Sequence, residues 1–570
     1  MIDIQSELNA YRGRYFEGEW PTIYQMFAIS LSRFPSRPCF TVFEPNRKTY
    51  TYSDVDKHIK AIAAKLIEAG VQPGEKVVIN GKNSVQWGMS YLAVNYIGAV
   101  VVPIDNQLKT ERVCALAQFA DAVYIIADFD VITKIPADNE WFRSIKGMMT
   151  LKGHIEGTEN VLEAESSKVY PCASTDCEAL AAILFTSGTT GNEKGAMMSN
   201  KNIVSDVWAA AANMDVNEND VLYALLPLHH SYSCTTVLLE TVKFGAECVF
   251  GHGIIVSRMV NDMKQGHVTI FMGIPLLYNK LLSGIMKQVK AKGKLTYAVV
   301  RTAMAINGWF KKNFGVVPLK GFFNKKILSA IGMDNNKFLI CGAGPLSPEV
   351  FKQYQQMGLD FLQGYGLTET APVLTLNPVR KFKVESIGVA LPMMDIIIAD
   401  PNEEGIGEIR VKGPNVTAGY YKDEENTRAL FDENGYLKTG DLAIKDKDGY
   451  FILKGRAKNI IVTEGGKNVY PEEIEDAFQT FENVEQILVR GYQQKKDVPC
   501  EAIEAVIYPN ADYYKDRNMN SDDIRKDIEA TVTQVNRSLV GYKKIEKITI
   551  IDKPMDMTTT KKIKRNTVAK

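Results

Sequence analysis

Residues 186–195 read Thr-Ser-Gly-Thr-Thr-Gly-Asn-Glu-Lys-Gly and follow a short apolar run. Glycines allow successive backbone N–H groups to converge on an anion, and the hydroxyl groups add further donors. Lys194 adds a positive charge suited to phosphate. The spacing is not that of the P-loop of kinases and GTPases, because Glu193 precedes Lys194 and Gly195 follows it. The segment is a candidate phosphate-binding loop, although its composition alone also fits an ordinary flexible loop.

A second polar segment, residues 363–370, reads Gln-Gly-Tyr-Gly-Leu-Thr-Glu-Thr and follows a predicted strand. The flat ring of Tyr365 suits stacking against a nucleotide base. The carboxylate of Glu369 is a hard oxygen ligand of the kind that Mg²⁺ prefers. Taken alone, the segment fits equally well a turn at the end of a strand with an exposed glutamate.

Three single residues elsewhere have side chains suited to a nucleotide or a carboxylate substrate. Asp441 offers two oxygens, which could accept both hydroxyl groups of a ribose. His230 lies in the segment 226–234, Leu-Pro-Leu-His-His-Ser-Tyr-Ser-Cys. Lys562 lies in the lysine-rich segment 558–565. Taken alone, each has an ordinary interpretation: a turn aspartate, a structural histidine and a solvated basic tail.

Together these segments resemble the adenylate-forming enzymes, which include acyl-CoA synthetases, luciferases and the adenylation domains of peptide synthetases. The usual family signature is T-S-G-T-T-G-x-P-K-G. Residues 186–195 match it at every position except Glu193, where the family usually has proline. Proline stiffens a loop, so Glu193 is expected to add flexibility and a negative charge near phosphate, which puts ATP affinity in doubt. The resemblance extends over essentially the whole chain.

The resemblance implies a role for each matching residue. Tyr365 would stack on adenine, Thr368 would meet the α-phosphate, and Glu369 would help to hold Mg²⁺. Asp441 would accept the ribose hydroxyls. The expected nucleotide-binding residues are Thr186, Ser187, Gly188, Thr189, Thr190, Gly191, Lys194, Gly342, Ala343, Gly364, Tyr365, Gly366, Thr368, Asp441, Arg456 and Lys458. The expected catalytic residues are Lys562, Thr368, Glu369, His230 and Lys194, and the expected metal ligand is Glu369.

The family works in two steps, which implies a mobile C-terminal domain. Lys562 matches the lysine that bridges carboxylate and phosphate during adenylation. Lys458 matches the hinge, where a change in one residue's φ and ψ swings the last domain. After that swing, Gly465 and Gly466 would line the tunnel for the pantetheine arm of coenzyme A. The same segment also fits an ordinary helix start, with Pro471 in the first turn.

Among the family's branches, the chain most resembles long-chain acyl-CoA synthetases. The resemblance rests on residues 273–278, 342–346 and 466–473 and on a basic, helix-rich insertion at 281–336. A medium- to long-chain fatty acid is the expected substrate, with ATP and coenzyme A. Amino-acid-activating relatives carry an aspartate where this chain has residues 231–233, Ser-Tyr-Ser, which disfavours a free amino acid. The alternatives are an acyl-AMP ligase that loads a carrier protein, an aryl-acid CoA ligase and a non-catalytic binding protein.

The composition of the chain limits the kinds of binding partner and the cellular compartment that are expected. Lysine plus arginine and aspartate plus glutamate number 67 each, so no overall bias toward nucleic acid or acidic membranes exists. The eight cysteines contain no C-x-x-C pair and the histidines number six, which argues against a zinc site or a disulfide framework and fits a reducing cytoplasm. No apolar run reaches ~18 residues, so no spanning helix is expected. Peripheral contact with a membrane stays open.

Apolar runs alternate with helical patterns through the first 375 residues, which predicts parallel sheets covered by helices on both faces. The spacing predicts a helix over 55–67, with Ser53 as its N-cap and Gly70 as its stop. Strands are predicted at 76–80, 100–104, 123–126, 181–185, 221–226, 268–271 and 338–341. The expected fold is α/β. It comprises an N-terminal domain at 1–457, with parallel-sheet subdomains and a small β-barrel subdomain at about 376–457, and a mobile α+β C-terminal domain at 458–570.

Overall fold

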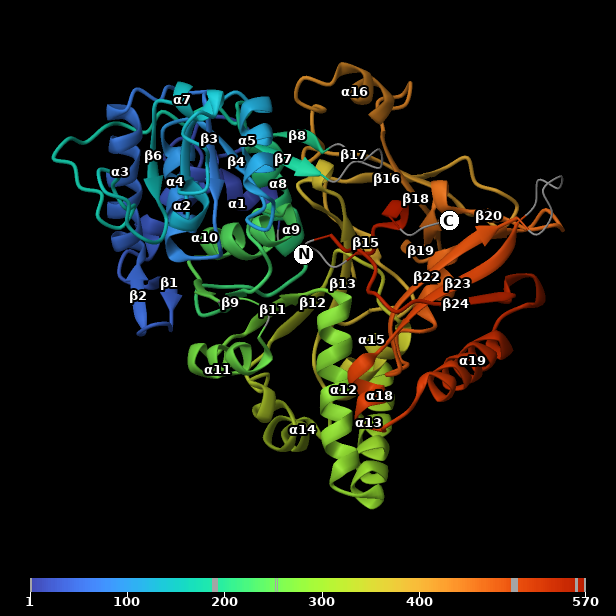
Figure 1. Ribbon diagram of the computed structural model, residues 1–570. Coiled ribbons are helices and arrows are strands. Elements are labelled where there is room, and N and C mark those ends of the chain that lie inside the picture. Colours follow the sequence, from blue (N-terminus) through green and yellow to red (C-terminus); the bar gives the residue numbers. More distant parts are fainter. Residues whose placement is uncertain are drawn as a thin grey trace.

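The computed structural model describes residues 3–186, 193–251, 253, 255–493, 501–558 and 562–567. Two large sheets and their helices form the body of the molecule, and the last part of the chain, drawn in orange and red, lies against one side of it (Figure 1). This mixed α/β architecture confirms the predicted fold class. The boundary at residue 458 stays a prediction.

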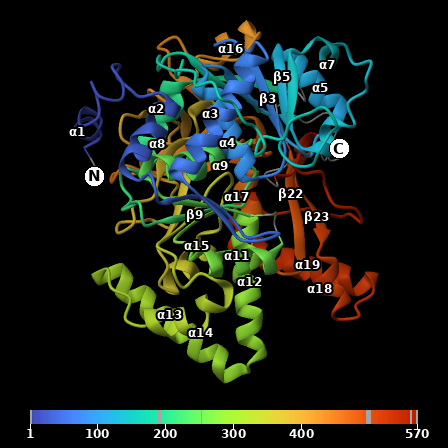
Figure 2. The same ribbon diagram turned by 90° about the vertical axis from the view of Figure 1, so that its left-hand side faces the viewer.

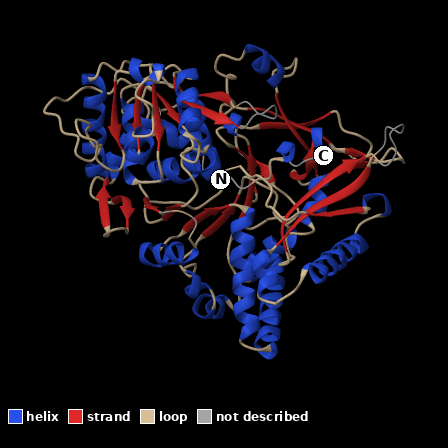
Figure 3. Ribbon diagram, viewed as in Figure 1, coloured by secondary structure: helices blue, strands red, loops and turns tan. Residues whose placement is uncertain are grey.

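The first sheet has six described strands in the order β6-β5-β3-β4-β7-β8. These strands are β3 (Lys76–Asn80), β4 (Val100–Pro103), β5 (Ala122–Ala127), β6 (Gly147–Thr150), β7 (Leu180–Thr186) and β8 (Lys194–Ser199). All neighbours are parallel except β7 and β8, which pair antiparallel. Helices cover both faces of the sheet (Figure 3). They include α2 (Ile23–Arg33), α3 (Tyr52–Glu68), α4 (Val85–Tyr96), α5 (Thr110–Phe119) and α8 (Asn200–Ala211).

The second sheet joins a parallel part to an antiparallel part. The parallel strands are β1 (Pro38–Val42), β9 (Val221–Ala224), β10 (Glu247–Phe250), β11 (Ile270–Gly273), β12 (Phe338–Cys341) and β13 (Phe361–Gly366), with β2 (Lys48–Thr51) antiparallel at the edge. The antiparallel strands are β14 (Val373–Leu376), β15 (Gly388–Ala390), β16 (Asp395–Ala399), β17 (Gly407–Lys412), β18 (Leu437–Lys445) and β19 (Tyr450–Arg456). The two parts are continuous because β14 pairs directly with β13. The β-rich segment is therefore antiparallel and is attached to the strand that carries Tyr365.

The C-terminal region has a three-stranded sheet of β22 (Val484–Tyr492), β23 (Ala502–Pro509) and β24 (Lys547–Ile550) and a short hairpin of β20 (Ile461–Val462) and β21 (Asn468–Val469). Its helices include α17 (Pro471–Asp476), α18 (Ala511–Lys515) and α19 (Ser521–Ser538). Ile474, Val489 and Ile528 belong to a buried cluster of this region's own, separate from the clusters of the body.

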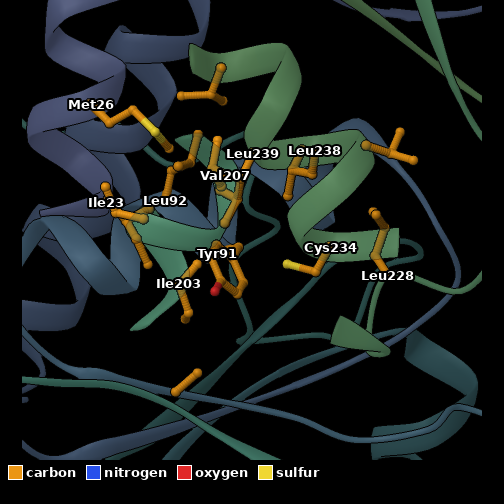
Figure 4. Close-up of a cluster of buried hydrophobic side chains, with 14 of the residues drawn as sticks. Ile23, Met26, Tyr91, Leu92, Ile203, Val207, Leu228, Cys234, Leu238 and Leu239 are labelled. Carbon is orange, nitrogen blue, oxygen red and sulfur yellow. The ribbon is translucent and has the colours of Figure 1, made fainter. Parts of the chain in front are cut away.

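The core of the body is built from helices that come from distant parts of the sequence. Figure 4 shows side chains of α2, α4 and α8 packed against the π-helix η1 (Cys234–Leu239). Ile23, Leu92, Val207 and Leu238 are all fully buried or nearly so. Because η1 follows His230 closely in the chain, this packing also fixes the position of that histidine.

The N-cap of helix α3 lies two residues before the predicted N-cap, Ser53. Thr51 caps it, because the Thr51 hydroxyl accepts a hydrogen bond from the Asp54 N–H and the Asp54 side chain accepts one from the Thr51 N–H. Ser53 is therefore inside the helix, and its prediction as N-cap is wrong. The predicted stop is right, since Gly70 follows the helix with a φ of 85°.

The basic insertion forms a long helical hairpin of α12 (Pro275–Ala291) and α13 (Lys294–Phe314), followed by α14 (Lys320–Lys326). The hairpin projects from the body in both side views (Figures 1 and 2). Among the described residues, no helix is both long enough and apolar enough to cross a membrane.

Candidate active site

One large cleft holds most of the residues selected from the sequence. Its volume is about 2660 Å³, and it lies where the ends of the parallel strands, the antiparallel strands and the C-terminal region meet. The predicted residues in its lining are Thr186, Lys194, His230, Gly342, Ala343, Gly364, Tyr365, Gly366, Thr368, Glu369, Asp441, Arg456, Lys458 and Lys562. Folding thus brings side chains from the middle and the far end of the chain to one place.

Asp441 is the centre of a buried polar cluster in this cleft. The register of β18 and β19 places it opposite Arg456. Its Oδ1 is 2.8 Å from the Arg456 Nε, and its Oδ2 accepts a hydrogen bond of 2.8 Å from the Tyr365 hydroxyl. Burial, and then the Asp441 charge, raise the pKa of Tyr365, so the phenol keeps its proton. Each carboxylate oxygen still has a lone pair available for a further donor.

A tyrosine that was not selected from the sequence links Lys194 to Glu369. The Tyr420 hydroxyl donates to Glu369 Oε1 at 2.8 Å, and Lys194 Nζ lies 5.0 Å from the centroid of the Tyr420 ring. Lys194 also donates to Asn426 Oδ1 at 2.5 Å. Tyr420 and Asn426 carried no sequence signal, because their contacts with Glu369 and Lys194 join residues more than fifty positions apart in the chain.

The candidate phosphate loop connects β7 to β8. Ser187, Gly188, Thr189, Thr190 and Gly191 lie outside the described residues. The two ends of the loop are described: Thr186 and Lys194 face each other as the last pair of the β7–β8 ladder. The Tyr421 N–H donates to the Gly195 carbonyl at 2.8 Å, which ties β8 to the segment that carries Tyr420. Both ends of the loop therefore open into the cleft.

Glu193, the departure from the family signature, forms an ion pair with Arg112 at the edge of the cleft. Arg112 belongs to α5, so the pair also joins the loop to a covering helix. The Glu193 charge is therefore balanced within the protein by a residue that lies far away in the sequence.

His229 and His230 are neighbouring rings with centroids 4.2 Å apart. Burial lowers the pKa of His229 to about 3. Burial lowers the pKa of His230 to about 3 as well, and His229 contributes to that shift. Both rings are therefore neutral near pH 7, and His230 can accept or donate a hydrogen bond in the cleft without carrying a charge.

We predict that His230 does not titrate in the folded protein between about pH 5 and pH 8, because its pKa lies far below the usual value of about 6.5. NMR chemical shifts of the imidazole carbons, assigned by the signal lost in His230→Asn, measure this. A transition of the His230 signal near pH 6.5 would show that the ring is solvated and not held as described.

Two glycines of the cleft are required by close approach. A Cβ on Gly342 would lie 2.9 Å from the Tyr232 ring, and a Cβ on Gly366 would lie 1.8 Å from the Pro372 carbonyl oxygen. No other residue type fits either position without movement of its neighbours. The wall that carries Tyr365 and the segment after β12 are therefore closely packed.

Lys562 enters the cleft from the C-terminal region. Its backbone is fixed to Thr558, with the Thr558 N–H donating to the Lys562 carbonyl at 2.8 Å. Arg565 anchors the same segment, since it donates to Glu475 at 2.7 Å and to the Val489 carbonyl at 2.8 Å. Desolvation within the cleft lowers the pKa of Lys562, and Arg456 lowers it further, while Asp441 opposes the shift. The Lys562 residue is nonetheless open to the solvent of the cleft.

Direct contacts hold the C-terminal region in this position. Gln479 Oε1 accepts a hydrogen bond of 2.9 Å from the Ser347 N–H, and Gln479 Nε2 donates to the Pro345 carbonyl at 3.2 Å. Gly465 and Gly466 are in the exposed turn between β20 and β21 and are absent from the cleft lining. The structure therefore brings Lys562 to the cleft and does not bring this glycine pair there.

The carboxylates near the cleft do not form a metal cage by themselves. Among the residues that the structure describes, no group of three or more histidine, cysteine, aspartate or glutamate side chains is arranged to hold a metal ion. Glu369 alone would suit Mg²⁺, which commonly takes one or two carboxylates and fills its other positions with phosphate oxygens and water. The donor set therefore fits a metal that arrives with a nucleotide.

Comparison with known proteins gives two family matches and several full-length relatives. Residues 27–421 match the family described as AMP-binding enzyme, and residues 458–570 match the AMP-binding enzyme C-terminal domain. A long-chain-fatty-acid–CoA ligase FadD15 of Mycobacterium bovis is 27% identical over 91% of this chain and 90% of its own. A chloroplastic long-chain-fatty-acid–[acyl-carrier-protein] ligase AEE15 of Arabidopsis thaliana is 25% identical, covering 96% and 85%. The solved structure of O-succinylbenzoate coenzyme A synthetase from Bacillus subtilis, in complex with ATP and magnesium ion, superimposes with a TM-score of 0.72 at 20% identity, covering 95% and 98%.

Proposed function

Since the chain belongs to the AMP-binding enzyme family, we propose that it uses ATP to activate a fatty acid and transfers the acyl group to coenzyme A. The observation that carries the proposal is the meeting of Lys562 with Asp441, Tyr365 and Glu369 in one cleft. Such a set can bind a nucleotide, neutralise phosphate and add a mobile cation from a second domain.

In the first half-reaction, one carboxylate oxygen of the acid attacks the α-phosphorus of ATP. A carbon–oxygen–phosphorus link forms, the bond to the β-phosphate oxygen breaks, and pyrophosphate leaves. Asp441 accepts the ribose hydroxyls, and Tyr365 lies against the adenine. Lys562 and Lys194 lower the repulsion between the anions by charge and position. Mg²⁺, bound through the phosphates and Glu369, would supply further charge neutralisation.

In the second half-reaction, the thiol of coenzyme A attacks the acyl carbon, and AMP leaves with the oxygen that links it to the acyl group. Lys562 is not needed for this step, and the thiol must have access to the acyl carbon in the cleft. A rotation of the C-terminal region about Lys458 would withdraw Lys562 and bring Gly465 and Gly466 to the cleft. The exposed position of these glycines is consistent with that proposal, since a Cβ built on either would meet nothing within 4 Å.

Apolar side chains in the cleft lining support a fatty acid as the substrate. Leu276, Leu282, Met286, Leu346 and Val350, here called the apolar arm, line the part of the cleft that runs along α12, beside Asn279, Ser283 and three lysines of the same helix. An alkyl chain bound there gains roughly 0.8 kcal/mol for each buried CH₂ group, which favours medium or long chains over short ones. An aryl acid would fill little of this arm.

The acyl acceptor has one specific alternative. The Arabidopsis relative is named as a ligase for acyl carrier protein, and its identity to this chain is close to that of the CoA ligase relative. Both acceptors present a pantetheine thiol, so the two reactions use the same chemistry. Detection of the thioester by mass, with either coenzyme A or holo-carrier protein supplied, separates them.

Exchange of labelled pyrophosphate into ATP tests the first half-reaction. The exchange should depend on added acid and should rise from C2 toward medium and long chains in a panel of C2–C20 and aromatic acids. If no acid in the panel supports exchange, the chain is not an acid-activating enzyme and the non-catalytic alternative gains.

Substitutions of Glu193 and of its partner Arg112 are expected to change ATP affinity by a smaller factor. Glu193→Pro removes the partner of Arg112 and a negative charge near the phosphate loop, so the Kd of ATP should fall by about twofold to fivefold, the scale of a partly exposed ion pair. Arg112→Ala should raise it by a similar factor, because Glu193 is then unbalanced. Calorimetric titration with ATP measures both variants. An unchanged Kd in each would place the phosphates away from Glu193.

A further inference from the structure

The hairpin of α12 and α13 carries a concentrated positive charge. From Pro275 to Met333 the sequence contains eleven lysine and arginine residues and no aspartate or glutamate. Because the whole chain balances at 67 of each sign, the remaining residues have an excess of eleven acidic side chains. Within the described part of the chain, ion pairs to this segment are formed only by Lys287 with Asp516 and Lys311 with Asp360. Most of the positive charge is therefore available to an external anion.

Helix α13 also has an exposed apolar stripe. Leu295, Val299, Ile306 and Trp309, here called the α13 stripe, are exposed by 80%, 53%, 42% and 56%. Their spacings of four, seven and three residues place all four on one side of an α-helix. On a different side, Val300 and Met304 are buried against the body. The stripe is thus not part of the core, and the ring contacts of Trp309 are with Phe310 and Phe314 of the same helix.

Lysines flank the α13 stripe. Lys294 and Lys312 lie at helical positions about 100° from it and are exposed, and Lys292 is exposed in the adjacent turn. Figures 1 and 2 both show α13 at the outer margin of the molecule, away from the six-stranded sheet. A helix with an apolar side that includes tryptophan and leucine, bordered by lysines, is typical of helices that lie in the interface of a bilayer.

We infer that the α12–α13 hairpin docks the protein on the surface of an anionic lipid bilayer, with the α13 stripe in the interface and the lysines on the lipid phosphates. The lysines match the phosphates of anionic lipid, and the exposed α13 stripe beside them suits the interface of a bilayer. The acidic body of a second copy would also attract the lysines, so dimerisation is one outcome that the experiments below must separate. A nucleic acid would match the lysines but leave the α13 stripe in water.

The position of the cleft indicates that docking delivers the substrate. This part of the inference rests on the proposed function. Tyr297 and Arg301 of α13 and Lys290 of α12 belong to the lining of the same cleft that contains Lys562. An acid leaving the bilayer beside the hairpin would meet cationic side chains at the cleft and then its apolar arm. Docking would thus deliver a poorly soluble acid without passage through bulk water.

Tryptophan fluorescence tests the docking directly. Of the five tryptophans, Trp20, Trp87, Trp141 and Trp208 are at least 95% buried, and Trp309 is the exposed one. Vesicles of phosphatidylcholine with phosphatidylglycerol should shift its emission to shorter wavelength, and brominated phosphatidylglycerol should quench it. Pure phosphatidylcholine vesicles should do neither, and Trp309→Phe should abolish both signals. Absence of a shift with anionic vesicles, or an equal shift with neutral ones, overturns the inference.

Charge variants identify the surface. Reversal of Lys292, Lys294 and Lys312 to glutamate should weaken partition onto anionic vesicles by about 100-fold or more, since each lysine near such a surface contributes roughly fivefold. The matched control reverses three exposed lysines elsewhere, Lys57, Lys168 and Lys447. Equal loss in the control would mean that net charge, and not the hairpin, controls binding. Burial of Trp309 through dimerisation without vesicles, seen in sedimentation equilibrium, would replace lipid by a second copy.

Failure of the docking inference can be distinguished from failure of the proposed function. With a soluble acid such as octanoate and no vesicles, the hairpin variant should retain full pyrophosphate exchange. With oleate presented in anionic vesicles, its exchange should fall by at least about tenfold relative to the control variant. Vesicle binding without any pyrophosphate exchange would contradict the proposed function alone. Pyrophosphate exchange without vesicle binding would contradict the docking inference alone.

Discussion

Lys562→Ala should reduce adenylation by about 100- to 1000-fold and leave thioester formation from supplied acyl-AMP nearly unchanged. The first loss is the size expected when one well-placed charge on a transition state is removed. Lys562 is one of the residues that the C-terminal region places in the cleft, with its backbone held by Thr558 and its segment held by Arg565. Because the second half-reaction follows withdrawal of this residue, the two rates should separate. Rapid-quench assays of acyl-AMP and of thioester measure them.

Lys553→Ala is the matched control, since Lys553 is an exposed lysine of the same region and is absent from the cleft lining. It should leave both half-reactions at the wild-type rate. Equal losses of both steps in Lys562→Ala would contradict the assignment of Lys562 to adenylation alone, and with it the proposed rotation.

Asp441→Ala should impair both half-reactions, because AMP is bound through the ribose in each. The change also leaves Arg456 without its partner at 2.8 Å and the Tyr365 hydroxyl without its acceptor. Loss of one member of a hydrogen-bonded charged pair in a binding site typically costs about 2–5 kcal/mol, so kcat/KM for ATP should fall by roughly 30- to 4000-fold. Steady-state kinetics with varied ATP, and separately with supplied acyl-AMP, measure the effect.

Asp448→Ala, at an exposed turn between β18 and β19, should have no such effect. Asp441→Asn keeps one acceptor oxygen and should fall between the wild type and Asp441→Ala. If Asp441→Ala reduced the stability of the protein without changing the KM for ATP, the residue would have a structural role only.

Much of the fold could be predicted because local pattern and tertiary environment agree in the parallel sheets. Buried strands such as β3 and β12 are short runs with an apolar centre, and the bounds predicted for both match the structure. The end of α3 was predictable because Gly70 adopts a conformation that few other residues tolerate. The start of α3 was not predictable, because Thr51 and Ser53 can both cap a helix. The side-chain pairing of Thr51 with Asp54 decides between them.

The site was predictable only where a motif is local in sequence. Tyr365 and Glu369 share one segment, and Thr186 and Lys194 share another. Tyr420 and Asn426 were missed because their contacts to Glu369 and Lys194 span 51 and 232 positions. The balance of Glu193 by Arg112 spans 81 positions and was missed for the same reason. Contacts of this kind depend on the packing of the two sheets and of the C-terminal region, which no local pattern specifies.

The transfer of oxygen from the acid tests the central claim most directly. A fatty acid labelled with ¹⁸O in both carboxylate oxygens is incubated with the protein, ATP, Mg²⁺ and coenzyme A, and the products are analysed by mass spectrometry. Attack of the carboxylate on the α-phosphorus predicts AMP with one ¹⁸O atom, thioester with the other, and unlabelled pyrophosphate. Label in inorganic phosphate with ADP as the nucleotide product, or AMP without label, would contradict the formation of an acyl adenylate.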